Sequence, residues 1–450
     1  MGSVLYTVLD KSYPVMERGE GIYLYDNEGN KYIDASSGTV VVGIGHGVKE
    51  VIDAVIEQIQ KISFLYGAQF TSKVREQLAD EIVDFSDHRY SKVFFASGGS
   101  EATEAALKIA RQYHLEAGNP KKSIVISRWK SYHGNTIGAV SMSGRTAWRE
   151  PYTPYLLDFP HIPPPYCYRC PFEMAYPGCK IKCARELETT ITQVGADYVS
   201  AFIAEPITGG TVAAMAPPPE YYGIVRETCD KYNVLFIADE VLCGFGRTGK
   251  LFAVDHWNVL PDLIATGKGI ASGYAAIGAV LLTQKVYEAF QNGSRTIKHS
   301  HTYSGIPVSC AAALAVLRYV RANHLVERSA EMGTYLFQRA QRLNENEIVG
   351  EVAGGKGLLL GIELVKNKHT KEPFPKSLHV DTWITNEALK ERMNILPGSG
   401  GCADGVNGDR IELAPPFVIK KEEIDEVISR IERAIKRVQT ELRQKGHLHT

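Results

Sequence analysis

The chain has 450 residues, of which 44% are hydrophobic and 22% are charged, and its formal net charge is −1. These values are ordinary for a soluble globular protein, and the length allows two or three structural domains. The near-neutral charge gives no reason to expect nucleic acid or an acidic membrane surface as a partner. No apolar run is long enough to span a bilayer, and residues 1–6 lack a secretory signal, so we expect a cytoplasmic protein without a membrane partner.

Hydrophobic periodicity predicts a hairpin first and then an alternation of strands and helices. We expect the hairpin at residues 21–33 with its turn at 26–30, and amphipathic helices over residues 48–62 and 72–85. The β-rich runs that follow are residues 92–95, 123–126, 199–204, 234–238, 263–265 and 279–282. Several are apolar on both faces, which is typical of a mostly parallel sheet covered by helices.

The last third of the chain predicts a helix through residues 311–314, a strand at 357–363 and a closing helix from 422 to about 445. The elements together predict an α/β fold. Residues 66–315 are expected to form the large domain around the sheet. Residues 1–65 and 316–450 are expected to combine into a smaller domain.

Lys268 lies between two glycines, directly after the apolar run 263–265. Flanking glycines let other groups approach the amine closely, at what would be the end of a strand. A desolvated lysine of lowered pKa attacks carbonyl groups and forms a Schiff base. An isolated lysine in a glycine turn is more often a surface residue, so this hypothesis depends on the motifs around it.

A glycine turn after the run 92–95 leads into a segment rich in helix formers, which begins Ser97-Gly98-Gly99-Ser100. The free N–H groups of Gly99 and Ser100, the Ser100 hydroxyl and the helix dipole would favour a phosphate. A plain serine helix cap is the alternative.

Tyr132 and Asp239 also follow strands of the predicted sheet. Tyr132, next to His133 and Gly134, is placed to stack on a flat ligand, with a core tyrosine as the alternative. A carboxylate such as Asp239 at the ligand-binding edge of the sheet needs a cationic partner to offset its desolvation. A protonated pyridine nitrogen of a bound ligand would be such a partner, and its charge would make the pyridine ring an electron sink. A structural ion pair with Lys268 is the other explanation, but it leaves the phosphate-type turn unexplained.

Two further motifs are ambiguous. Residues 244–250 match the dinucleotide-binding pattern G-x-G-x-x-G and most of a Walker A pattern. Walker A needs a serine or threonine for magnesium where this chain has Leu251, and the dinucleotide pattern needs an acid about 20 residues downstream that is missing. Nucleotide binding is therefore disfavoured. Four of the 8 cysteines have spacing that suits a structural zinc, namely Cys167, Cys170, Cys179 and Cys183. The surrounding prolines favour a loop with reduced thiols instead, and we predict no metal site. A disulfide is a third option, but it suits an intracellular setting poorly.

The sequence resembles class III aminotransferases, pyridoxal phosphate (PLP) enzymes of fold type I, and most closely their amine and ω-amino-acid:pyruvate branch. The resemblance runs over almost the whole chain and is carried by residues 202–207 (FIAEPI), 238–241 (ADEV), 244–249 (GFGRTG), 267–269 (GKG) and 301–305 (HTYSG). It implies a large domain with a seven-stranded sheet, a smaller α+β domain from both termini, and a homodimer with shared active sites.

The resemblance also implies roles for individual residues. Lys268 would be the Schiff-base lysine and proton shuttle, and Asp239 would pair with the pyridine nitrogen. Tyr132 and Val241 would cover the two faces of the ring, and Glu205 resembles the family's buried acid beside the cofactor.

The resemblance assigns the phosphate to Gly99 and Ser100, and to Thr302 from the second subunit. The substrate side departs from the family pattern. Val40 stands where well-known amine transaminases have a bulky tryptophan, which implies a smaller pocket wall, and the family's carboxylate-binding arginine falls near Pro397. Arg410 either replaces that arginine or is a surface residue at the start of a strand.

The function implied is transfer of an amino group from a primary amine or ω-amino acid to a keto acid such as pyruvate, by a ping-pong mechanism. Two alternatives stay open. The same scaffold also supports PLP lyases, decarboxylases and aminomutases, and a nucleotide-binding or non-catalytic α/β protein is the alternative outside PLP chemistry.

Overall fold

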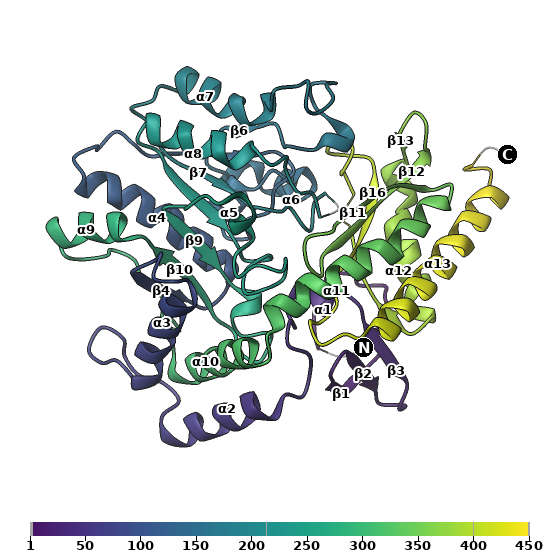
Figure 1. The fold of residues 1–450 in the computed structure, drawn as a ribbon, viewed down its shortest axis with the longest axis horizontal. Helices are drawn as coiled ribbons and strands as arrows, with labels where there is room; N and C mark the ends of the chain where they lie inside the picture. Colours follow the sequence, from purple (N-terminus) through teal and green to yellow (C-terminus); the bar gives the residue numbers. More distant parts are fainter. Residues whose placement is uncertain (1–2, 213, 399, 449–450) are drawn as a thin grey trace.

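A seven-stranded sheet forms the centre of the larger part of the molecule (Figure 1). The computed structural model describes residues 3–212, 214–398 and 400–448. The strand order is β4 (Lys92–Ala96), β10 (Gly278–Leu282), β9 (Leu263–Thr266), β8 (Leu235–Asp239), β7 (Val199–Ala204), β5 (Ile124–Arg128) and β6 (His161–Ile162). The pairs β5–β6, β5–β7, β7–β8 and β8–β9 are parallel, whereas β10 runs antiparallel to both β9 and β4. The predicted α/β class with a mostly parallel sheet is therefore confirmed.

Helices cover both faces of this sheet because its central strands are apolar on both sides. Ile203 and Ile237 face one core cluster, whereas Phe202 and Phe236 face another. The first cluster is covered by α4 (Gly99–Glu116) and α9 (Gln284–Asn292). The second is covered by α3 (Lys73–Phe85), α7 (Lys182–Val194), α8 (Tyr221–Lys231) and α10 (Pro307–Ala322).

A smaller sheet joins three N-terminal strands to one short strand from the C-terminal part of the chain. Its strands are β1 (Met16–Glu20), β2 (Tyr23–Asp26), β3 (Lys31–Asp34) and β14 (Met393–Asn394). The C-terminal strand β14 pairs in parallel with β3, so Met393 lies opposite Ile33. The predicted hairpin is confirmed as β2 and β3.

A third sheet contains β11 (Val349–Ala353), β12 (Leu360–Asn367), β16 (Asp409–Leu413) and β15 (Leu396–Pro397), with β13 (Glu372–Pro373) paired to β12. Its core is shared with α11 (Leu325–Ala340), α12 (Val380–Lys390) and α13 (Lys421–Gln444). By contrast, α2 (Lys49–Lys61) packs along α10. The domain divisions at residues 65/66 and 315/316 stay predictions, and the second falls within α10. No helix among the described residues has the length and apolarity that a bilayer crossing requires.

Asp409 makes the stability of the third sheet dependent on pH. Its carboxyl group is buried at the start of β16, where it accepts a hydrogen bond from the Val380 N–H (3.1 Å). Burial, together with the nearby Asp381 carboxylate, raises the pKa of Asp409 to about 7. In the unfolded chain the same group titrates near about pH 4. Between these pH values only the folded state keeps the proton, so the free energy of unfolding falls as the pH rises.

Asp409→Asn removes this titrating group, so the free energy of unfolding should fall less steeply as the pH rises. Relative to the wild type, the variant should gain roughly 1–3 kcal/mol in free energy of unfolding between about pH 4.5 and about pH 7.5. Urea denaturation at both pH values measures the difference. A variant whose stability follows the same pH slope as the wild type would contradict the assignment.

Candidate active site

Lys268 lies just beyond the C-terminal end of β9, in the 3₁₀ turn η4 (Lys268–Ile270). Its backbone is left-handed, with φ 42°, and the residue is half-buried. Burial lowers the pKa of the amine below its usual value, while the carboxylates of Glu412 and Asp239 oppose that shift. A strained lysine with a depressed pKa is what a nucleophilic amine requires.

Asp239 ends β8, the strand next to β9, with Asp239 opposite Ala265 in the ladder. The carboxylate is 3% exposed and is held from two sides. The Nδ1–H of His133 donates to Oδ2 (2.6 Å), and the Val241 N–H donates to Oδ1 (3.0 Å). The carboxyl ends of neighbouring parallel strands meet at one sheet edge, so Asp239 and Lys268 face the same region.

The N-terminus of α4 approaches Lys268 through glycine backbones. A Cβ added to Gly267 would lie 3.2 Å from both the Cα and the N of Gly99, and one added to Gly99 would lie 2.5 Å from Cγ1 of Val241. A side chain at either position would therefore force its neighbour to shift. A Cβ added to Gly98 would meet no heavy atom within 4 Å, so the helix end faces open space. Its free N–H groups are available to an anion there.

Tyr132 and Glu205 are joined at the same edge. The Tyr132 N–H donates to Oε2 of Glu205 (3.2 Å), and burial raises the pKa of Glu205 to about 7. The Tyr132 ring is half-buried and packs edge-on against Trp148, with 5.9 Å between the ring centroids. The Ser100 hydroxyl, in the first turn of α4, accepts a hydrogen bond from the Asn135 N–H (3.1 Å).

The structure thus gathers seven of the predicted site residues around one sheet edge: Gly99, Ser100, Tyr132, Glu205, Asp239, Val241 and Lys268. His133 and Glu412 are two further residues of this region that sequence analysis did not assign. His133 holds Asp239, and Glu412 is a fully buried acid whose charge acts on Lys268.

Val40 and Thr302 are not among the predicted site residues that the hydrogen bonds and close approaches above bring together. Val40 is buried and has φ 60°, a strained conformation for a β-branched residue. The segment that follows it contacts the turn after Lys268, because the Ile44 N–H donates to the Ser272 hydroxyl (3.0 Å). Thr302 is exposed in the single chain.

Arg410 lies at the start of β16, as one of the two interpretations expected, but it is 2% exposed and is not a surface residue. Its Nη1 lies 3.2 Å from Oε2 of Glu412, and its Nη2 donates to the Gly210 carbonyl. The surface alternative is therefore wrong, because the side chain turns inward to an ion pair inside the protein.

The two ambiguous motifs have structural explanations. Arg247, within the nucleotide-like motif, is buried and donates to the carbonyls of Leu358 (3.0 Å) and Pro415 (2.6 Å), so it anchors the C-terminal segment. The four clustered cysteines line one small recess and are free thiols. No three His, Cys, Asp or Glu side chains within the described ranges are placed to hold a metal ion.

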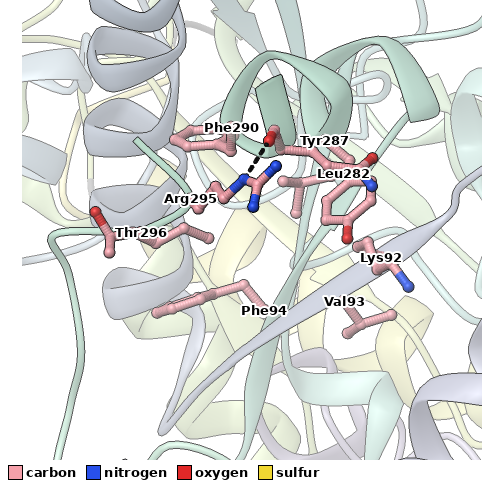
Figure 2. A pocket seen from close by; sticks show the side chains of 10 residues that line it. Lys92, Val93, Phe94, Leu282, Tyr287, Phe290, Arg295 and Thr296 are labelled. Atoms are coloured by element: carbon pink, nitrogen blue, oxygen red, sulfur yellow. Dashed lines mark hydrogen bonds between the residues drawn. The ribbon is translucent and has the colours of Figure 1, made fainter. Parts of the chain in front are cut away.

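A separate surface cavity of about 580 Å³ lies at the edge of the large sheet, between β4 and α9 (Figure 2). Phe94, Leu282 and Phe290 line it with apolar side chains, and Lys92 and Arg295 are among its lining residues. None of the predicted site residues lines it, so it is not part of the candidate active site.

Comparisons with known proteins identify the family. A family model described as aminotransferase class-III matches residues 8–435. The chain is 41% identical to the uncharacterized aminotransferase YodT of Bacillus subtilis, over 97% of this chain and 98% of that protein. It is 36% identical to the putrescine–pyruvate aminotransferase of Pseudomonas aeruginosa, over 93% of this chain and 90% of that protein.

The solved structures agree. A PLP-bound amine transaminase from an uncultivated Pseudomonas species superposes with a TM-score of 0.90 at 33% identity, over 97% of this chain and 98% of that one. The predicted resemblance, fold type and aminotransferase class are confirmed. The chain belongs to the class III aminotransferases, which are PLP-dependent enzymes of fold type I.

Proposed function

We propose that the protein transfers an amino group from a primary amine or ω-amino acid to a keto acid such as pyruvate, in a ping-pong reaction that uses PLP. The placement of Lys268 and Asp239 on adjacent strand ends, beside the N-terminus of α4, supports this most directly. The names of two relatives, a putrescine–pyruvate aminotransferase and an amine transaminase, favour the amine branch for the substrate.

The residues present fit PLP. Asp239 has acceptor capacity left after its bonds from His133 and Val241, and it would hold a protonated ring nitrogen. The open helix end at Gly99 suits the phosphate. When bound, PLP supplies an aldehyde that condenses with amines and a ring that accepts electrons from the substrate carbon.

We assign the proton transfers to Lys268. Its lowered pKa leaves a larger neutral fraction at neutral pH, so the amine can take a proton from the substrate carbon and return it at a neighbouring position. Asp239 would stabilise a positive charge on the ring nitrogen of bound PLP, and His133 orients the carboxylate. We assign Tyr132 and Val241 to the two faces of the ring, and Glu205 to a supporting position under Tyr132.

We also propose a cytoplasmic homodimer in which Thr302 reaches the phosphate of the partner's site. Phe64, Tyr66, Phe70 and Tyr303 are 44%, 62%, 67% and 61% exposed, and the rings of Phe64 and Tyr303 lie 6.2 Å apart. Exposed aromatic residues of this kind are typical of protein interfaces. All eight cysteines are free, as is usual in the cytoplasm.

A single-turnover experiment tests the function. The PLP-loaded protein is mixed with an amine donor and no keto acid. A ping-pong transaminase releases one equivalent of oxo product per site and then stops until pyruvate is added. Continued turnover without a keto acid would indicate a lyase, decarboxylase or aminomutase, and would contradict transamination.

Gly99→Ala is expected to weaken PLP binding. The added methyl would lie 2.5 Å from Cγ1 of Val241, so either the helix end or the side chain that covers the ring must move. Loss of one good phosphate contact would raise the dissociation constant of PLP about tenfold or more. Titration of the cofactor-free protein with PLP measures it.

Gly223→Ala is the control, because its methyl meets no heavy atom within 4 Å and it lies in α8 rather than at the N-terminus of α4. The Gly99 variant should lose clearly more PLP affinity than the Gly223 variant. If Gly99→Ala binds PLP as tightly as the wild type does, the helix end is not the phosphate site.

A further inference from the structure

Arg145 is a cation beside Tyr132, the residue proposed to cover one face of the PLP ring. It directly precedes the short helix α6 (Thr146–Arg149). The guanidinium lies 5.6 Å from the ring centroid of Tyr132 and 4.7 Å from that of Trp148. Because these two rings pack edge to face, they hold the guanidinium at a defined place next to Tyr132.

No counter-ion pairs with this guanidinium among the residues that the structure describes. Its Nε is buried without a hydrogen-bond partner, and no carboxylate of the described residues forms an ion pair with it. Burial, with the nearby positive charge of Arg410, lowers the pKa of Arg145 to about 10. A desolvated cation without a partner is unfavourable, and an incoming anion would offset that penalty.

Arg145 also lines a cavity of about 470 Å³, together with Trp129, Lys130, Thr146, Thr211 and the acidic Asp404. None of the residues predicted to hold the cofactor lines this cavity, so the contact of Arg145 with Tyr132, and not the cavity, places its guanidinium beside the candidate active site. Lys130 donates to the carbonyls of Cys402 and Ala403, so its charge is already engaged. Within the described part of the cavity wall, Arg145 is therefore the cation with free donors.

Arg410 is differently placed. Its Nη1 pairs with Glu412 and its Nη2 donates to the Gly210 carbonyl, so both terminal nitrogens are engaged inside the protein, and its Nε, like that of Arg145, lacks a partner among the described residues. A substrate carboxylate at Arg410 would have to displace Glu412, which is fully buried, whereas at Arg145 it would displace no ion-pair partner within the described ranges.

We propose that Arg145 binds the carboxylate of the substrate and makes the enzyme select ω-amino acids and keto acids over neutral amines and aldehydes. The selectivity for substrates rests on the proposed transaminase function, whereas the binding of a carboxylate by Arg145 does not depend on it. The planar guanidinium binds a carboxylate through two parallel hydrogen bonds, which gives orientation as well as affinity.

The first test compares 4-aminobutyrate with n-butylamine as donors for the PLP-loaded enzyme. The ratio of their kcat/KM values should fall about 10- to 100-fold in Arg145→Gln, because a charge-assisted pair is lost for one donor only. Arg145→Lys keeps the positive charge but loses the two parallel donors of the guanidinium, so the ratio should fall less in this variant. Lys130→Gln removes the same charge from the same cavity and should change the ratio clearly less than Arg145→Gln.

The second test needs no turnover. Calorimetric titration of the PLP-loaded protein with butyrate should give a dissociation constant about tenfold or more higher in Arg145→Gln, with butyramide as the neutral reference. Equal butyrate affinity in the wild type and Arg145→Gln, or an equal loss in Lys130→Gln, would overturn the proposal. If neither donor yields an oxo product but butyrate binding still depends on Arg145, the transaminase proposal fails while the carboxylate site stands.

Discussion

Replacing Lys268 by alanine is expected to lower turnover by roughly 10⁴-fold or more, because both the nucleophile and the proton carrier are lost. The visible absorbance of lysine-bound PLP should disappear as well. Steady-state kinetics with pyruvate and an absorbance spectrum of the purified variant measure the two effects. Lys268 is the candidate because its half-buried amine has a lowered pKa and lies beside Asp239 at the sheet edge.

Two controls separate the chemical role of Lys268 from a structural one. Lys250→Ala removes an exposed lysine from a nearby turn and should leave both readouts unchanged. Methylamine added to Lys268→Ala should restore part of the rate, because a free amine can carry the proton. Substantial turnover by Lys268→Ala without added amine would end the proposed mechanism.

Asp239→Asn is expected to lower kcat by about 10²- to 10⁴-fold, because the ring nitrogen loses the charge that keeps it protonated. The amide keeps the size of the side chain and can still accept the Val241 N–H (3.0 Å). The loss should appear in kcat and in PLP retention during dialysis, with the folded state preserved. Kinetics, dialysis and thermal unfolding of the variant measure the three properties.

Glu240→Gln is the matched control for Asp239→Asn. Glu240 is the next residue along the chain, but its carboxyl group points away and accepts the N–H groups of Ala253 (2.9 Å) and Val254 (2.8 Å). Burial raises its pKa to about 8. In Glu240→Gln the amide oxygen can accept one of these two N–H groups and the other loses its acceptor, so thermal unfolding of this variant is measured alongside turnover. Turnover should fall far less than in Asp239→Asn, and equal losses in the two variants would argue against a specific role for Asp239.

The main strands were predictable because burial on both faces leaves a continuous apolar run in the sequence, as in β7 and β8. Other strands carry no such signal. β1 is polar and mostly exposed, and β6, β14 and β15 have two residues each. The pairing of Met393 with Ile33 depends on the tertiary fold, so no local pattern reveals it.

The site divides in the same way. Lys268 and Asp239 were predictable because polar residues directly after buried parallel strands meet at one edge. The bond from His133 to Asp239 joins residues far apart in the chain, and no local pattern marks it. Arg410 and Glu412 alternate with apolar residues in β16, which usually indicates exposure, yet both are buried because they pair with each other. Arg145 became a candidate only when its lack of an ion-pair partner in the described structure was known.

The most direct test of the account is to locate the covalent link to PLP. Borohydride reduction of the purified PLP-loaded protein fixes the cofactor to its lysine, and peptide mass spectrometry then identifies the modified residue. We expect the phosphopyridoxyl group on the peptide that carries Lys268. In Asp239→Asn protein that is dialysed before the reduction, a smaller fraction of this peptide should carry the group. A stable adduct on another lysine, or no adduct on a protein saturated with PLP, would contradict the proposed site.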